Sequence, residues 1–187
     1  MKKFLSNTYM ILIFAILYAP ILILIFFSFN SSNSNVVFDG FSLRWYKELF
    51  QEGCMYQVKP YDGIRELLAA LKEKEVALAV LSNKPHAETI HVIETLFGKG
   101  YFDVIQGQKE NVAIKPSPEG AFQIFEQLAL TPDDVLYLGD TATDMKTGKS
   151  AGAFTLGALW GFRDRKELEE AGADAIIEHP LELLQYL

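Results

Sequence analysis

The chain has 187 residues, of which 50% are hydrophobic, and a formal net charge of −7 at pH 7. This length accommodates one domain of ordinary size and little more. Residues 1–50 carry four Lys or Arg against two acidic residues, whereas residues 51–187 carry thirteen against twenty-two. Nucleic acids require a basic protein surface, so this acidic part excludes them as expected partners. The single cysteine, Cys54, excludes an internal disulfide.

An uninterrupted apolar run lies near the start of the chain. From Tyr9 to Phe27 no residue is charged, and at about 1.5 Å per residue the run spans roughly 28 Å, close to the thickness of a bilayer core. A secretory signal peptide would have a shorter apolar core, followed by small residues at a cleavage site. The sequence therefore predicts one transmembrane helix over residues 9–29, and Lys2 and Lys3 before it favour a cytoplasmic N-terminus.

The remainder of the chain alternates amphipathic segments with short apolar runs. Asp62 is expected to cap a helix whose apolar residues follow at helical spacing as far as Leu71. Strands are predicted over residues 76–81, 101–105, 135–138, 153–159 and 175–177, with helices that end near residues 97, 130, 151, 171 and 186. Strands with little polar alternation, separated by helices, predict an α/β fold with a parallel sheet covered on both faces.

The most informative stretch follows the predicted strand 135–138. Gly139 allows the backbone to turn, and Asp140 stands at the carboxyl end of the strand, where open α/β sheets bind their ligands. Asp144 follows about one helical turn later. Two carboxylates directed at one point suit Mg²⁺, which is usually held by one or two carboxylates together with water and substrate phosphate. A turn aspartate followed by a helix-capping aspartate is the alternative, and this stretch alone leaves both open.

Two further polar residues lie beside predicted element ends. Ser82 ends the strand 76–81, and Lys115 precedes a helix. A hydroxyl beside the unpaired amides of a helix N-terminus binds phosphate, and a lysine adds charge to the same group. Taken singly, Ser82 is explained as a helix cap and Lys115 as a solvated loop residue. Together with the carboxylates, they predict a site for phosphoryl transfer.

These motifs resemble the haloacid dehalogenase (HAD) superfamily over about residues 55–187. Leu81-Ser82-Asn83-Lys84-Pro85 is similar to its second motif, Lys115-Pro116 to its third, and Gly139-Asp140-Thr141 with Asp144 to its fourth. The resemblance implies a catalytic set of Ser82, Lys115, Asp140 and Asp144. Within it, Ser82, Asn83 and Lys115 are expected to bind the phosphoryl group, and Asp140 and Asp144 to bind Mg²⁺.

Two other segments point to one branch of this superfamily. Residues 59–63 and the string Trp160-Gly161-Phe162-Arg163 resemble the phosphoglycolate phosphatase-like members. This resemblance implies a small phosphorylated metabolite as substrate and a cytoplasmic location for this part of the chain.

The first motif of the superfamily is not found in this sequence. In the superfamily a strand that ends in Asp-x-Asp supplies the nucleophile and the general acid/base, and a helical cap domain follows it. The nearest string here surrounds Asp39, and Phe41 occupies the place of the second acid.

We therefore expect a Rossmann-like core without its central first strand, which would lie between strands 76–81 and 135–138. Those two strands then either pair with each other or leave backbone groups unsatisfied, unless residues 36–39, which have strand-like side chains, enter the gap. Covalent catalysis requires its nucleophile, so we expect the hydrolytic activity to be lost.

Residues 1–50 resemble a different family. Residues 17–22, 28–32 and 40–46 are similar to the start of an ABC transporter inner-membrane permease of the spermidine/putrescine type. We therefore expect a permease-like segment over 1–50, which anchors the chain in the membrane, and a truncated HAD-like core over 51–187. Three functions remain open: a Mg²⁺-dependent phosphomonoesterase, a membrane component related to a polyamine permease, and an inactive anchored domain that binds phosphate and Mg²⁺. A fusion of two unrelated sequences is the simplest explanation of the two halves.

Overall fold

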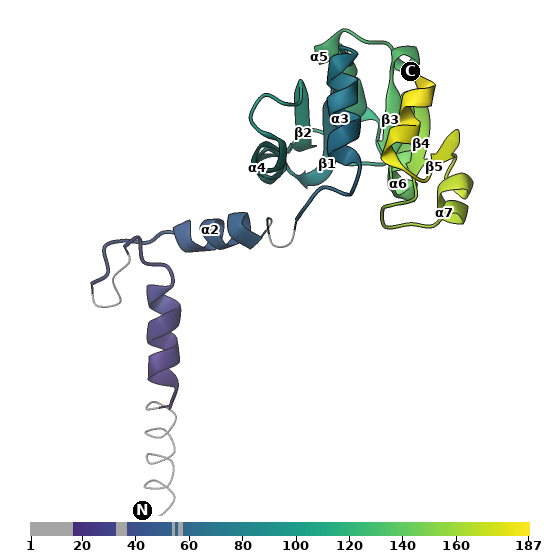
Figure 1. The fold of residues 1–187 in the computed structure, drawn as a ribbon. Helices are drawn as coiled ribbons and strands as arrows, with labels where there is room; N and C mark the ends of the chain where they lie inside the picture. The colour runs from purple at the N-terminus through teal and green to yellow at the C-terminus, as the bar shows by residue number, and fades with distance from the viewer. Residues whose placement is uncertain (1–16, 33–36, 54, 56–57) are drawn as a thin grey trace, which may run out of the picture. The chain divides into compact units, whose positions relative to one another are not determined.

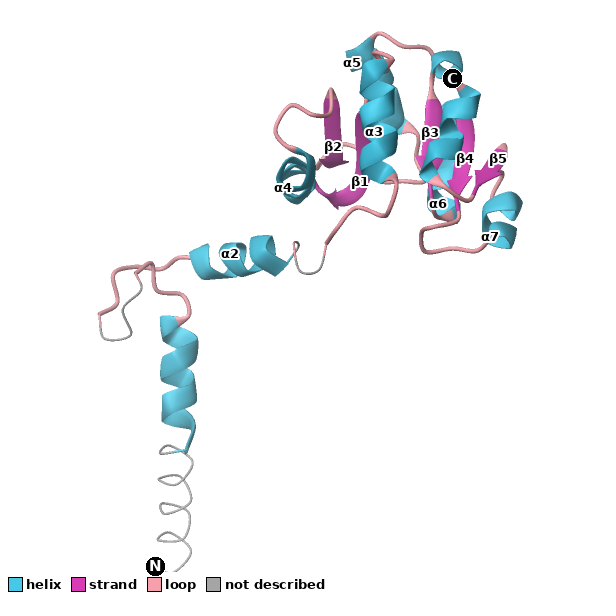
Figure 2. Ribbon diagram, in the orientation of Figure 1, coloured by secondary structure: helices cyan, strands magenta, loops and turns pink. Residues whose placement is uncertain are grey.

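The computed structural model describes residues 17–32, 37–53, 55 and 58–187. The chain divides into two compact units, Met1–Tyr56 and Gln57–Leu187. Figure 1 labels helices α2 to α7 and all five strands, and Figure 2 separates helices from strands. The candidate site residues all lie in the second unit.

The described part of the first unit contains two helices and a loop organised by Asn30. Residues 17–27 are helical, and α2 covers Arg44–Gly53. Asn30 is only 1% exposed. Its side chain accepts a hydrogen bond from the Asp39 amide (2.9 Å) and donates one to the Val37 carbonyl (2.7 Å). Neither this loop nor α2 was predicted from the sequence.

The predicted transmembrane helix falls partly outside the described residues. Of the predicted span, residues 9–16 are not described, and the helix in the described part ends at residue 27. Within the described ranges no helix is both long enough and apolar enough to cross a membrane.

The second unit alternates helices and strands, which confirms the predicted α/β class. Its elements are α3 (Ile64–Glu73), β1 (Ala79–Pro85), α4 (His86–Phe97), β2 (Val104–Gln108), α5 (Glu119–Leu128), the 3₁₀ helix η1 (Pro132–Asp134), β3 (Leu136–Gly139), α6 (Ala142–Ala151), β4 (Phe154–Ala158), α7 (Arg165–Glu170), β5 (Ala175–Ile177) and the 3₁₀ helix η2 (Pro180–Tyr186).

The strands form two parallel sheets. One contains β1 and β2, with Val80 opposite Ile105. The other has the order β3-β4-β5, with Leu138 opposite Leu156. In the described part of the chain, β1 and β3 do not pair with each other (Figure 1). Of the two outcomes expected for these strands, direct pairing is therefore excluded.

The apolar core lies on both faces of the sheets. Leu136 and Leu138 of β3 pack against one cluster, which contains buried residues of α3, β4, β5 and η2. Tyr137 packs against a second cluster, which contains Phe125 of α5 and Ala151 of α6. Because successive side chains of a strand point to opposite faces, the two clusters lie on opposite sides of β3. Helices therefore cover both faces, as predicted.

Several predicted boundaries are wrong, each for a local reason. The strand expected over 76–81 begins at Ala79, because the amide of Leu78 donates to the Asp103 carboxylate (2.7 Å). Asp62 does not cap α3; the N-cap is Gly63 in the left-handed conformation, without a side-chain hydrogen bond. The final helix is a 3₁₀ helix.

Candidate functional site

A buried ion pair joins the ends of the two sheets. Lys115 Nζ donates to Asp144 Oδ1 (2.7 Å) and to the carbonyl oxygen of Leu81 in β1 (3.1 Å). Asp144 lies in the first turn of α6, shortly after β3 ends. The two side chains are 15% and 10% exposed. The lysine therefore ties the carboxyl end of β3 to β1 in a place that water reaches poorly.

Asn83 holds the backbone of this lysine. Its side-chain oxygen accepts from the Lys115 amide (2.9 Å), and its side-chain nitrogen donates to the Lys115 carbonyl (3.1 Å). The peptide bond from Lys115 to Pro116 is cis. In the structure the Asn83 amide anchors the loop that carries Lys115. Phosphate binding by Asn83 stays a prediction.

Ser82 does not lie where the sequence placed it. It falls inside β1, which continues to Pro85, and the following helix α4 begins only at His86. The Ser82 hydroxyl accepts from the amide of Lys84 (3.1 Å) and caps no helix. Ser82 is therefore neither a helix cap nor a hydroxyl at the N-terminus of a helix. It does share the lining of one small pocket with Asn83 and Lys115.

Asp144 is fixed by the start of α6. Thr141 is the N-cap of this helix; its hydroxyl accepts from the Asp144 amide (3.3 Å) and donates to Asp144 Oδ2 (2.6 Å). A Cβ atom at position 139 would collide with the Asp144 side chain. Glycine at 139 is therefore needed for the strand end to approach the carboxylate. The residue that caps the helix is Thr141, so the capping alternative does not account for Asp144.

Asp140 is held by the loop after β4. From the sequence, residues 160–163 of this loop were noted only for their resemblance to phosphoglycolate phosphatase-like proteins. Its Oδ2 accepts from the amide of Phe162 (3.1 Å). A Cβ atom on Gly161 would collide with the Asp140 carboxylate. The loop after β4 thus forms a wall of the site. The string Trp160-Gly161-Phe162 drew attention to this loop. Nothing in the local sequence indicated that the loop contacts Asp140, which lies 22 residues before Phe162.

The carboxylates fit a Mg²⁺ ion better than a metal with many protein ligands. The described ranges contain no group of three or more His, Cys, Asp and Glu residues that could hold a metal. Asp140 Oδ1 has no hydrogen bond to another described residue, whereas both oxygens of Asp144 are engaged. Mg²⁺ usually keeps several waters and takes only one or two carboxylates. Asp140 would therefore be its first protein ligand, with Asp144 beside it.

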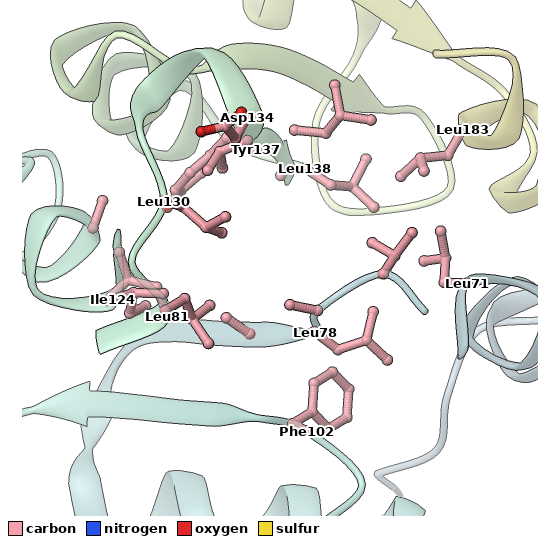
Figure 3. Close-up of a pocket in the computed structure, with 18 of the residues that line it drawn as sticks. Leu71, Leu78, Leu81, Phe102, Ile124, Leu130, Asp134, Tyr137, Leu138 and Leu183 are labelled. Atoms are coloured by element: carbon pink, nitrogen blue, oxygen red, sulfur yellow. The ribbon is translucent and has the colours of Figure 1, made fainter. Parts of the chain in front are cut away.

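Burial and the neighbouring carboxylate both favour the neutral form of Tyr137. Burial raises the pKa of Tyr137 well above its ordinary value, and the negative charge of Asp144 raises that pKa further. A neutral phenol adds no charge to the pair formed by Lys115 and Asp144. Lys115, Asp140 and Asp144 all line a cavity of about 510 Å³, most of whose other lining residues are apolar (Figure 3).

The chain is similar to known proteins in sequence and in fold. A family model described as haloacid dehalogenase-like hydrolase matches residues 21–158. An N-acetylmuramic acid 6-phosphate phosphatase from Pseudomonas aeruginosa is 33% identical over 142 residues, which are 74% of this chain and 62% of that protein. A phosphoglycolate phosphatase from Aquifex aeolicus is 34% identical over 142 residues, which are 76% of this chain and 65% of that protein.

A solved structure shares the fold. The crystal structure of a predicted phosphatase from Clostridium acetobutylicum has a TM-score of 0.68 and 28% sequence identity, and the match covers 77% of this chain and 67% of that one. The chain spans less than two thirds of the length of the two curated relatives above. The family match begins at residue 21, inside the segment that resembles a permease, so the permease interpretation stays a prediction. Because the family model matches well over half of the residues, the chain belongs to the haloacid dehalogenase-like hydrolases.

Proposed function

We propose that the second unit is the phosphate- and Mg²⁺-binding part of a phosphomonoester hydrolase for small phosphorylated metabolites. The observation that carries this proposal is the poorly hydrated Lys115, held between Leu81 and Asp144 at the carboxyl edge of the sheets, with Asp140 lining the same cavity. The names of the two curated relatives, a phosphatase for N-acetylmuramic acid 6-phosphate and one for phosphoglycolate, support the substrate class.

Lys115 retains the capacity to bind a phosphate oxygen. An ammonium group has three N–H donors, and Leu81 and Asp144 accept from two of them. The third N–H is left for a ligand, and the Ser82 hydroxyl is the other protein donor proposed for the same phosphoryl group. Asp140 and Asp144 would hold Mg²⁺, which when bound neutralises charge on the phosphoryl oxygens.

We further propose that this chain binds its ligand without turning it over. Formation of a covalent phosphoryl intermediate needs a nucleophile, and the sequence contains no Asp-x-Asp motif. The only comparable string has Asp39 followed two residues later by Phe41. The side chains named above bind and orient a phosphoryl group but provide no group that attacks it.

Calorimetry on the full chain tests the binding site. Mg²⁺ is titrated first, and inorganic phosphate is then titrated in the presence of Mg²⁺. We expect saturable Mg²⁺ binding that Asp140→Asn abolishes, and phosphate binding that Lys115→Met abolishes. The control is Lys166→Met, because the Lys166 side chain is 81% exposed and pairs only with Glu170 on the surface of α7. Absence of both binding events in the folded wild-type chain would contradict the proposed site.

Turnover is tested separately with p-nitrophenyl phosphate. We expect no hydrolysis above the rate in buffer. Hydrolysis by the wild-type chain that persists in Asp39→Ala and disappears in Asp140→Asn would contradict the proposed inactivity while leaving the binding site intact.

A second candidate function, membrane association through residues 9–29, is favoured by one observation. The described helix over 17–27 is apolar on all sides, and Leu17, Leu22 and Leu24 are 60%, 64% and 67% exposed. A helix that is apolar all round requires an apolar environment. The full chain is expected to float with lipid vesicles in a density gradient. A chain that stays soluble without detergent and sediments away from the vesicles would exclude this function.

A further inference from the structure

The cavity of about 510 Å³ lies between the two sheets. Its lining includes residues of both β1 and β3. In Figure 3, Leu78 and Leu81 lie along one side of the open space, and Tyr137 and Leu138 lie along the opposite side. Each of these two strands pairs with a neighbour on its other edge, β1 with β2 and β3 with β4.

The cavity runs along the edges of the strands and not over their faces. Residues 135–140 are consecutive, and every one of them lines it. On the other side it is lined by residues 76–79, which lead into β1, and by Leu81. Successive side chains of a strand point to opposite faces. A space that touches each residue in a row must therefore meet the strand edge, where the backbone N–H and C=O groups project.

Apolar side chains close the cavity above and below. Leu67 and Leu71 of α3 line it together with Leu183 of η2, and Ile124 and Leu128 of α5 also line it. None of these side chains supplies a hydrogen-bond partner. A backbone group that is buried without a partner costs about 1–3 kcal/mol. Apart from the Leu81 carbonyl, which accepts from Lys115 Nζ, the groups on these edges of β1 and β3 have no strand partner among the described residues. An occupant with its own row of donors and acceptors would pair with them.

The two edges also run in the same direction. The Lys115 ammonium contacts the carbonyl of Leu81, in β1, and the carboxylate of Asp144, just beyond β3. Asn83, further along β1, holds the backbone of the same lysine, so the course of β1 beyond Leu81 and the end of β3 both lead toward Lys115. Neighbouring strands in a sheet are about 4.7–4.9 Å apart, and a single strand can pair on both of its edges.

We propose that this cavity is a binding slot for one β-strand of another polypeptide, parallel to β1 and β3. The strand would be extended and uncharged over about five residues, the usual length of a strand, with apolar side chains on both faces. It would pair with both edges and join the two sheets into one. A small apolar ligand would fill the volume but leave the backbone groups unpaired. Lys115, Asp140 and Asp144 of the proposed phosphate and Mg²⁺ site also line this cavity, so the slot adjoins that site, but most of its lining residues take no part in it.

A synthetic peptide is the probe for this slot. It has about five alternating Val and Ile residues, lysines at both ends for solubility, blocked termini and a fluorescein label. Fluorescence anisotropy with the full chain is expected to show saturable one-to-one binding. The matched control peptide carries N-methyl groups on alternate residues and so cannot donate to one strand edge. We expect it to bind roughly tenfold more weakly, because the loss of one to two hydrogen bonds is enough for that factor.

Two substitutions on α5 distinguish peptide binding in the slot from binding to the helix surface. Leu128 lines the slot, whereas Phe122 on the same helix is 46% exposed and does not. Leu128→Arg is expected to weaken peptide binding at least about tenfold, and Phe122→Arg to leave it unchanged. Circular dichroism establishes whether each variant is folded.

Amide hydrogen exchange on the wild-type chain tests whether the peptide pairs with β1 and β3, even if Leu128→Arg fails to fold. The bound peptide is expected to slow exchange in β1 and β3 and to leave β5 unchanged, because β5 is at the far edge of its sheet. Equal affinity of the N-methylated peptide, or no added protection in β1 and β3, would overturn the proposal. So would occupation by the apolar dye anilinonaphthalene sulfonate with no binding of the peptide. A chain that binds phosphate and Mg²⁺ but not the peptide would refute the slot and leave the proposed function standing.

Discussion

Lys115 and Asp144 are two charges of the candidate site that water reaches poorly. Their atoms are 2.7 Å apart, and their side chains are 15% and 10% exposed. Removal of one partner from such a pair leaves the other charge poorly solvated, which costs about 3 kcal/mol. We expect Lys115→Met to lower the free energy of unfolding by about that amount, measured by urea denaturation.

The double variant Lys115→Met/Asp144→Asn serves as the control for this prediction. With both charges removed, no unpaired ion remains, and most of the lost stability should return. Strictly additive losses would show that the two side chains are not coupled. The exposed Lys166→Met should be close to neutral, because surface ion pairs contribute about 0–1 kcal/mol.

Gly161 is expected to matter for metal binding although it has no side chain. A Cβ atom at this position would collide with the Asp140 carboxylate. Gly161→Ala should therefore displace the first proposed ligand of Mg²⁺ and weaken Mg²⁺ binding about tenfold, as changes in the supporting shell of a metal site usually do. Calorimetric titration measures this effect. Gly53→Ala is the control, because nothing lies within 4 Å of the added atom. Unchanged affinity in Gly161→Ala would contradict the placement of Asp140.

At the level of elements, Asp174 connects α6, β4 and β5. Its carboxylate accepts from Lys149 Nζ in α6 (2.7 Å) and from the amide of Thr155 in β4 (2.8 Å), and it directly precedes β5. Partial burial by itself would raise the pKa of Asp174, but these hydrogen bonds and the lysine charge lower it below its ordinary value of 3.8.

This lowered pKa makes the contribution of Asp174 dependent on pH. A carboxyl whose pKa is lower in the folded state stabilises the fold above its unfolded pKa, and this stabilisation is lost as the pH falls through the folded pKa. We expect Asp174→Asn to lower the free energy of unfolding by about 1–2 kcal/mol at neutral pH. The difference should shrink as the pH falls below 3.8, the ordinary pKa of this carboxyl. Urea denaturation at both pH values measures it, and a loss that does not change with pH would contradict the charge-based explanation.

The sequence predicted elements well where composition alone decides them. The strand at 175–177 and the end of α6 at Ala151 agree with the structure, since a short apolar run and a following glycine mark them locally. The start of β1 was wrong because Val76, Ala77 and Leu78 are as apolar as the strand itself. Only the long-range hydrogen bond from Leu78 to Asp103 shows that the ladder begins later.

The charged residues of the site could be predicted from the sequence, but the residues that hold them in place could not. Asp140, Asp144 and Lys115 stood out by their positions after strands and before helices, and the structure brings all three to one cavity. Ser82 was misplaced because the strand continues past it. The anchoring of Lys115 by Asn83 was not visible, since the hydrogen bonds join positions 32 residues apart and no local pattern encodes such a pairing.

For the whole molecule, the division into two units suggests that the second one folds by itself. Both apolar core clusters consist of residues between Leu67 and Tyr186, inside the unit Gln57–Leu187. A fragment of residues 57–187 should therefore melt within about 2 °C of the corresponding transition of the full chain. Differential scanning calorimetry of both forms measures this. A fragment that shows no cooperative transition would mean that residues 1–56 contribute to the core.

The unpaired edges of β1 and β3 also bear on how much of this protein a cell can maintain. An open strand edge is a template for pairing with other chains, which proteins usually avoid by covering it. Molecules with empty slots should self-associate as their concentration rises. Molecules that unfold would be removed by chaperones and proteases. If a partner strand occupies the slot, the steady-state amount of this chain would follow the supply of that partner. Co-production of the two would then raise the soluble yield more than any change in expression level of this chain alone.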